Sequence, residues 1–329
     1  MNKKKSFINI TIVMLIILIM VGFSSVEAKT FNIKLGTVWP NDHPTSKAIE
    51  EVFIPYVEKE SGGAIKITHY PNFQLGSERA LGESAMTGAI EMVAIGNLIM
   101  TVIPELKIPE LPFMWEDDKE VSKALNGDFG RVIKERMAEK GLVNIAWTKR
   151  GFRQITSNKP INSLDDLKGF KLRLPEVDYY VEMAKAFGAI PTVITWPEVY
   201  TALQQGVVDG QENPIETIYS MKFYEVQPYL ALTKHILTFG QVMANKKYWD
   251  SLPSEMQSII LAGAEKMRIK QAELVDELEN TALDDLRNKG IIITEPDREP
   301  FRKATKYILD DFVKNNPWAK ELFQMLGKM

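Results

Sequence analysis

Arg173 is the residue whose type and position point most clearly to chemistry. It lies near the end of residues 170–174, whose alternating apolar side chains predict a strand, and Pro175 directly follows. Ligands of open α/β sheets bind beyond the carboxyl ends of the strands. An arginine at such an end can hold a carboxylate through two parallel hydrogen bonds, so we expect an acid-binding role. A surface salt bridge is the alternative.

Trp196 is the second candidate. Thr195 is a suitable N-cap, Glu198 lies three residues later as in a capping box, and Pro197 suits a first turn, so the pattern predicts a helix that begins here and stops at Gly206. The free N–H groups of a helix N-terminus favour anions, and an indole could form an apolar wall against a ligand. A core aromatic residue is the alternative.

A polar run from Asp209 to Pro214 is the third candidate. It follows a segment that we expect to be a buried strand, and it contains Glu212 and Asn213. The amide of a buried asparagine both donates and accepts, which suits recognition of a hydroxyl or a carboxylate. Taken alone, the run is typical of a polar turn.

Composition excludes several other kinds of chemistry. The chain has no cysteine, which excludes disulfides, thiol catalysis and thiolate-bound metals. Its three histidines (His43, His69 and His235) lack metal-ligand spacing, and no phosphate-binding loop, dinucleotide fingerprint or serine-nucleophile elbow is present. With 40 Lys and Arg against 43 Asp and Glu, the net charge of -3 argues against nucleic acid as a partner. The sequence therefore favours binding over turnover, without metal or cofactor.

The first 28 residues have the features of an export signal. Lysines at positions 3–5 precede an apolar run over residues 10–21, and Val26-Glu27-Ala28 fits a small-x-small cleavage pattern. The apolar run is short for a permanent membrane anchor, which is the alternative. We therefore expect cleavage after Ala28 and a periplasmic protein.

The elements that must position these candidates alternate along the chain. Strand patterns cover residues 31–35, 64–70, 90–95, 142–147, 153–156, 170–174 and 291–293, and helix patterns cover residues 43–60, 78–87, 177–187, 195–205, 254–288 and 300–314. The β-α-β-α-β order predicts an α/β fold with a mostly parallel sheet. Residues 86–91 resemble residues 204–209, as two similar lobes would. Residues 254–288 form either one long helix that braces two lobes or two helices with a bend near Gly263.

Several motifs together resemble a known family. The most specific are Phe-Lys-Leu-Arg-Leu-Pro at 170–175, Gly-Ala-Ile-Pro-Thr at 188–192, and the long run from Trp196 to Pro214 that ends in Gln-Glu-Asn-Pro. Residues 70–79, 151–161 and 223–226 match as well. On these residues the chain resembles the periplasmic solute-binding subunit of tripartite ATP-independent periplasmic (TRAP) transporters, the DctP type, over nearly the whole mature chain.

The resemblance implies a two-lobed periplasmic-binding-protein fold with mixed sheets, hinge strands and a long bracing helix. One lobe would comprise residues 29–150 and 239–278, and the other residues 151–238 and 279–329. A small organic acid would bind between the lobes, which would close on it. Small and large membrane permease subunits would then receive the acid, and an ion gradient would drive transport.

The resemblance also implies roles for individual residues. Arg173 would pair with the substrate carboxylate and Arg153 would be a second cation beside it. Asn213 and Trp196 would contact the ligand, and Glu78 would contact its hydroxyl groups. The full set of candidate substrate-binding residues is Arg173, Arg153, Asn213, Trp196, Glu78, Arg150, His43 and Glu212, with His235 in the layer behind them.

The ligand itself is defined less closely. Sialate-binding members carry an Asn and an acid near the positions of Val38 and Gly96, which argues against sialate. The combination of Trp196 with Gln-Gln-Gly at 204–206 resembles the sequences of members that bind sugar acids such as uronates more than those of sialate-binding members. Arg150 beside Arg153 would suit a C4-dicarboxylate, unless Arg150 is an exposed hinge charge. A 2-oxo acid is a further alternative ligand, and a solute sensor for a signalling receptor or an exported sugar-acid enzyme are alternative functions.

Overall fold

A single mixed sheet organises the chain. The computed structural model describes residues 30–96 and 98–329, so the expected export signal lies outside the described residues. Within them the strands are β1 (Phe31–Thr37), β2 (Ile65–Tyr70), β3 (Met92–Ile95), β4 (Leu142–Ser157), β5 (Lys171–Leu174), β6 (Ile190–Val193), β7 (Gly210–Pro214), β8 (Tyr229–Ala231), β9 (Leu237–Asn245) and β10 (Ile292–Thr294). Their order is β2–β1–β3–β9–β4–β7–β5–β6, and β8 joins β4 to β10.

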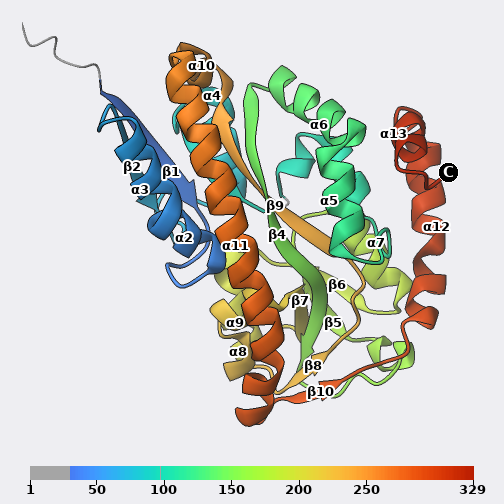
Figure 1. Cartoon of the computed structure of the whole chain (residues 1–329). Coiled ribbons are helices and arrows are strands. Elements are labelled where there is room, and N and C mark those ends of the chain that lie inside the picture. The colour runs from blue at the N-terminus through green and yellow to red at the C-terminus, as the bar shows by residue number, and fades with distance from the viewer. Residues whose placement is uncertain (1–29, 97) are drawn as a thin grey trace, which may run out of the picture.

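The sheet has two halves that share β4. In the β1 half, β1 is parallel to β2 and β3, and β9 is antiparallel to β3. In the β5 half, β5 is parallel to β6 and β7. Residues 142–152 of β4 pair with β9, whereas residues 153–157 pair with β7 and β8, so β4 passes from one half to the other (Figure 1). The α/β class and the mixed sheet are confirmed.

The prediction of two separate strands at 142–147 and 153–156 is wrong, because β4 is continuous. The strand accommodates Gly151 as an irregularity in the pairing with β9, between Lys149 and Gly151. Gly151 has a φ of 92°, which side chains with a Cβ rarely adopt. A position that favours glycine therefore lies inside the strand that joins the two halves.

Helices cover both faces of the sheet. They are α2 (Pro44–Ala48), α3 (Ile54–Glu60), α4 (Glu78–Thr87), α5 (Asp118–Asn126), α6 (Asp128–Glu139), α7 (Asp178–Ala186), α8 (Val199–Gln204), α9 (Ile215–Ser220), α10 (Lys246–Ser251), α11 (Ser254–Asn288), α12 (Glu299–Asn315) and α13 (Ala319–Met325). A wider π-helical turn, Ile49–Phe53, joins α2 to α3, so the predicted helix at 43–60 is present with a local irregularity. No helix in the described ranges is long and apolar enough to cross a membrane.

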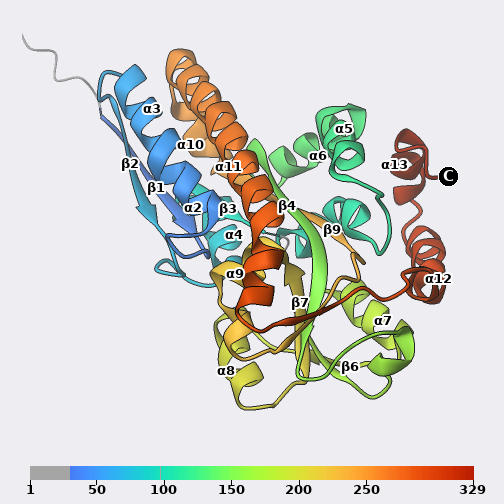
Figure 2. The same ribbon diagram turned by 60° about the horizontal axis from the view of Figure 1, so that its bottom comes forward.

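The long helix α11 is one element of 35 residues, and the alternative of two helices bent at Gly263 is wrong. Gly263 instead permits close packing, since a Cβ there would lie 2.7 Å from Val57 Cγ2. Along its length α11 contacts α2 and α3, then β4, then α9 (Figures 1 and 2). It therefore touches elements that belong to both halves of the sheet.

Candidate functional site

A cavity of about 180 Å³ lies where the two halves of the sheet meet; we call it the cleft. The β1 half contributes Val38, Trp39, Glu78, Arg79 and Leu98 to its lining, β4 contributes Arg150 and Arg153, and the β5 half contributes Arg173, Pro175, Val193, Trp196 and Asn213. Six of the eight candidate substrate-binding residues line the cleft. His43 and Glu212 are buried beside it.

Arg173 is held at the end of β5, as the sequence predicted, and only 2% of it is exposed. Its Nε and Nη2 donate to the carbonyl oxygen of Ile194 over 3.0 and 2.7 Å, and its guanidinium lies over the Trp196 ring. Among the described residues it has no ion pair with an acid. Burial, with the like charge of Arg153, lowers the pKa of Arg173 to about 9, although Glu212 opposes the shift. The group still carries a proton at neutral pH and thus a buried positive charge.

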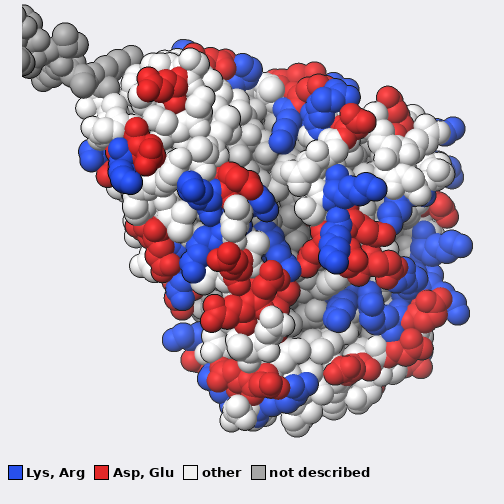
Figure 3. Space-filling view, viewed as in Figure 1, with Lys and Arg blue, Asp and Glu red and all other residues white. Residues whose placement is uncertain are grey.

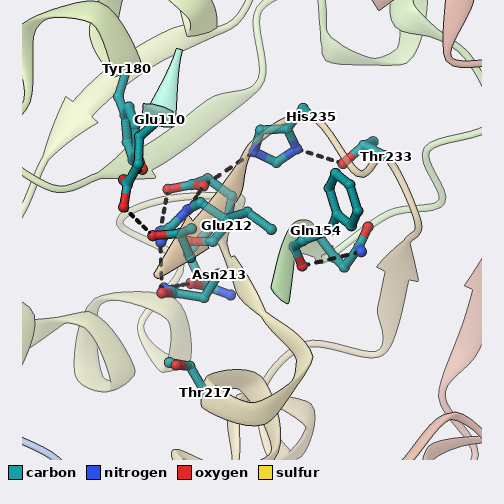
Figure 4. A network of polar contacts seen from close by, with 12 residues as sticks. Glu110, Gln154, Tyr180, Glu212, Asn213, Thr217, Thr233 and His235 are labelled. Atoms are coloured by element: carbon teal, nitrogen blue, oxygen red, sulfur yellow. Dashed lines mark hydrogen bonds and ion pairs between the residues drawn. The ribbon is translucent and has the colours of Figure 1, made fainter. Parts of the chain in front are cut away.

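Arg153, in contrast, is already paired. Glu212 on β7 binds it through Nε and Nη2, and Asn213 Oδ1 accepts from Nη2 over 3.2 Å (Figure 4). Burial acts to lower the pKa of Arg153, but the charge of Glu212 outweighs it and the net shift is upward. Glu212 also lies 3.2 Å from His235 Nε2, so His235 contacts Glu212 on β7.

The protonation of His235 follows from its partners. Burial lowers the pKa of its imidazole, although Glu212 opposes the shift. Nδ1 lies 2.7 Å from the hydroxyl of Thr233, which can donate to it, and this leaves Nε2 to donate to Glu212. A neutral imidazole with this tautomer holds the Glu212 carboxylate in place.

The interpretation of residues 209–214 as a polar turn is wrong, because residues 210–214 form β7 and all five are buried. Their polar side chains are compensated by one another and by β4: Asn213 Nδ2 donates to Gln211 Oε1 over 2.6 Å, and Gln211 Nε2 donates to Thr156 over 3.0 Å. Buried polar groups of this kind are tolerated when hydrogen-bonded. Asn213 is thereby fixed with its amide at the cleft.

Arg150 is buried, with 5% exposed, so the alternative of an exposed hinge charge is wrong. Its Nε donates to Glu216 Oε1 over 3.0 Å and its Nη2 donates to the Thr217 hydroxyl over 2.7 Å. His43 Nε2 lies 2.5 Å from the other Glu216 oxygen, and the His43 ring stacks on Trp39. Burial raises the pKa of Glu216, but His43 and Arg150 outweigh it and bring that pKa to about 2.

Glu78 and Trp196 line opposite parts of the cleft. Glu78 begins α4, and its Oε1 accepts from the backbone N–H of Leu98 over 2.8 Å, while burial raises its pKa. Trp196 is half-buried against Phe223, and its indole Nε1 has no hydrogen-bond partner among the described residues. The predicted capping box is wrong. The Thr195 hydroxyl donates to the Glu198 carboxylate and makes no capping hydrogen bond to the helix.

Sequence reasoning missed Glu216 and Trp39. Trp39 follows β1, so the strand-end rule that selected Arg173 could have found it. Glu216 has no local signal, since an acid in the first turn of a helix is ordinary at a surface. No group of His, Asp and Glu residues that could hold a metal occurs in the described part of the chain.

A buried guanidinium without an acidic partner in the described part of the chain, in a cleft between two halves joined by the continuous strand β4, defines a binding protein for a small organic anion. The chain belongs to the bacterial extracellular solute-binding protein family 7, DctP, whose sequence model matches residues 35–316. The resemblance to TRAP solute-binding subunits and the two-lobed fold are therefore confirmed. Proteins of this family are periplasmic solute-binding proteins and not enzymes, and they work with the membrane subunits of TRAP transporters.

Three relatives illustrate the match. A TRAP periplasmic solute-binding protein from Haemophilus influenzae, solved with bound L-gulonate, is 34% identical, with a TM-score of 0.87 over 91% of this chain and 99% of that chain. A protein from Roseobacter denitrificans, solved with bound β-D-glucuronate, is 26% identical, with a TM-score of 0.86 over 90% and 98%. The sialic acid-binding protein SiaP of Vibrio cholerae is 33% identical over 91% of this chain and 93% of its own.

Proposed function

We propose that this protein captures a sugar acid with a single carboxylate, such as a uronate or an aldonate, for a TRAP transporter. The observation that carries the proposal is Arg173, which is buried at the cleft without an acidic partner among the described residues. A buried charge is costly unless it is paired, so a carboxylate beside Arg173 would remove that cost when the cleft is closed.

The charges around the cleft favour one carboxylate over two. Arg153 is compensated by Glu212 and Arg150 by Glu216, so within the described residues Arg173 is the one of these three arginines that lacks an acid. A C4-dicarboxylate would leave its second carboxylate without a free cation. Glu78 and Asn213 offer acceptors and donors suited to the hydroxyl groups of a sugar acid, and a simple 2-oxo acid has no such groups. Two solved relatives bind L-gulonate and β-D-glucuronate, and each of these ligands combines one carboxylate with several hydroxyl groups.

The proposed cycle runs from export of the chain to delivery of the acid at the membrane. The signal would be removed after Ala28, and the lobes would be residues 29–150 with 239–278 and residues 151–238 with 279–329. This division is supported by the change of β4 from β9 to β7 and β8 at residues 152–153. The acid would shift the open–closed equilibrium towards the closed form, which small and large permease subunits would recognise.

Titration calorimetry on the mature protein tests the ligand class. The panel is D-glucuronate, D-galacturonate and L-gulonate against succinate, pyruvate and neutral D-glucose. We expect at least one sugar acid to bind more tightly than every other compound. Tighter binding of succinate or pyruvate, or equal binding of glucose, would contradict the proposal.

A further inference from the structure

A second cavity, of about 680 Å³, lies between α5, α6 and α11, with β4 and β9 as its floor; we call it the hinge groove. The surface is recessed between α11 and the α5–α6 pair (Figure 3). The hinge groove is larger than the cleft. Of its lining residues, only Arg150 also lines the cleft, so the two cavities meet the same strand but are separate.

The floor of the hinge groove combines two aromatic rings with the polar side chains of Asn144, Thr148 and Thr238. Trp147 and Phe239 pack edge to face with their ring centres 5.5 Å apart, and Leu125 and Leu261 line the walls. Leu261 is 45% exposed, so part of this apolar wall is open to solvent. Trp147 Nε1 has no hydrogen-bond partner among the described residues. The floor thus suits the body of an aromatic or alkyl molecule.

The rim of the hinge groove is positive, although the chain has a net charge of -3. Six cationic side chains line it against two carboxylates, Asp118 and Glu265, and those two are already paired with Lys149 and Arg268. Lys119 and Lys123 on α5 and Lys134 on α6 have no ion pair within the described part of the chain. A cavity lined by charges of one sign concentrates the field and attracts the opposite charge.

We propose that the hinge groove is a second binding site, which takes an amphipathic organic anion. Its aromatic or alkyl body packs against Trp147 and Phe239, and its acid group meets Lys119, Lys123 and Lys134. The hinge groove should discriminate among ligands less by geometry than the cleft does. Lysines are mobile point charges and do not fix a carboxylate as the planar fork of Arg173 does.

The six tryptophans supply the test, because each gives one indole N–H signal in a ¹⁵N-labelled protein. The probe is 1-naphthoate, with neutral 1-naphthalenemethanol as the charge control. We expect naphthoate to shift the Trp147 signal saturably in the wild type and in Arg173→Ala, where the cleft cannot hold the acid. The double variant Lys123→Glu/Lys134→Glu should weaken this binding at least about tenfold, a change of about 1.4 kcal/mol.

The matched control is Lys306→Glu/Lys314→Glu, which makes the same charge change on exposed positions of α12 and should leave the affinity unchanged. The proposal is overturned if the Trp147 signal does not move, or if naphthoate shifts only Trp39 and Trp196 at the cleft. Equal binding of the neutral probe, or equal weakening in both double variants, would overturn it as well.

Discussion

The guanidinium carbon of Arg173 lies 5.4 Å from the centre of the Trp196 ring, and two of its five N–H groups donate to the carbonyl oxygen of Ile194. The remaining three N–H groups have no partner among the described residues. The backbone and the indole therefore fix the plane of the guanidinium before a ligand arrives. Such preorganisation lowers the ordering cost of binding.

Arg173 should be essential for binding, and its shape should matter as much as its charge. We expect Arg173→Ala to weaken the affinity for the sugar acid by about 30-fold or more, the equivalent of at least about 2 kcal/mol. Arg173→Lys should also weaken it strongly, since an ammonium cannot form the planar fork. Calorimetry measures both, with Lys171→Ala, exposed on the same strand, as the control. Unchanged affinity in Arg173→Ala would reject the role.

Glu216 should determine how many carboxylates the cleft accepts. Glu216→Gln removes the acid that compensates Arg150 and leaves a second unpaired cation at the cleft. We expect the ratio of the dissociation constants for galacturonate and the diacid galactarate to shift by about tenfold or more towards the diacid. Calorimetry with both ligands measures the ratio. If the ratio does not shift towards galactarate, Arg150 does not face the ligand.

How far the sequence predicts this site depends on the range of the interactions. Arg173 follows from local rules, because a strand, its end and the following proline are all neighbours in sequence. Residues 210–214 mislead, because their polar side chains are compensated by Thr156 and Arg153 on β4, far away in the chain. The local pattern did select Asn213 as an amide suited to a hydroxyl or a carboxylate, but it did not predict the buried strand that holds this residue. Glu216 was missed for the same reason, since its partners His43 and Arg150 come from other elements.

Gln271 should stabilise the strand that joins the two halves. Its buried amide accepts from the Lys149 backbone N–H over 3.0 Å and donates to the Lys149 carbonyl over 2.7 Å, beside the irregularity at Gly151. Gln271→Ala leaves both backbone groups without this partner, so we expect the free energy of unfolding to fall by about 2–4 kcal/mol. Urea unfolding measures it, with the exposed Glu273→Ala on the same helix as the control. A loss no larger than that of the control would contradict this role.

Glu279 should make the free energy of unfolding of the protein depend on pH. Burial raises its pKa from 4.5 to about 7; Asp118 and Asp276 add to the shift, and Lys149, 3.7 Å away, opposes it. Between about pH 4.5 and 7 the folded protein therefore binds a proton that the unfolded chain releases. This contribution to stability is fully present below that window and is lost as the pH rises through 7, with an upper limit of about 3 kcal/mol.

Glu279→Gln removes this titration and should flatten that part of the pH profile. We expect the free energy of unfolding of the variant, relative to the wild type, to rise by about 1–3 kcal/mol between pH 5 and pH 8. Urea unfolding at pH 5, 6, 7 and 8 measures the difference. Glu277→Gln, exposed on the same helix, is the matched control and should run parallel to the wild type. If Glu279→Gln also runs parallel, the carboxyl group does not titrate in this window and Lys149 keeps it ionised throughout.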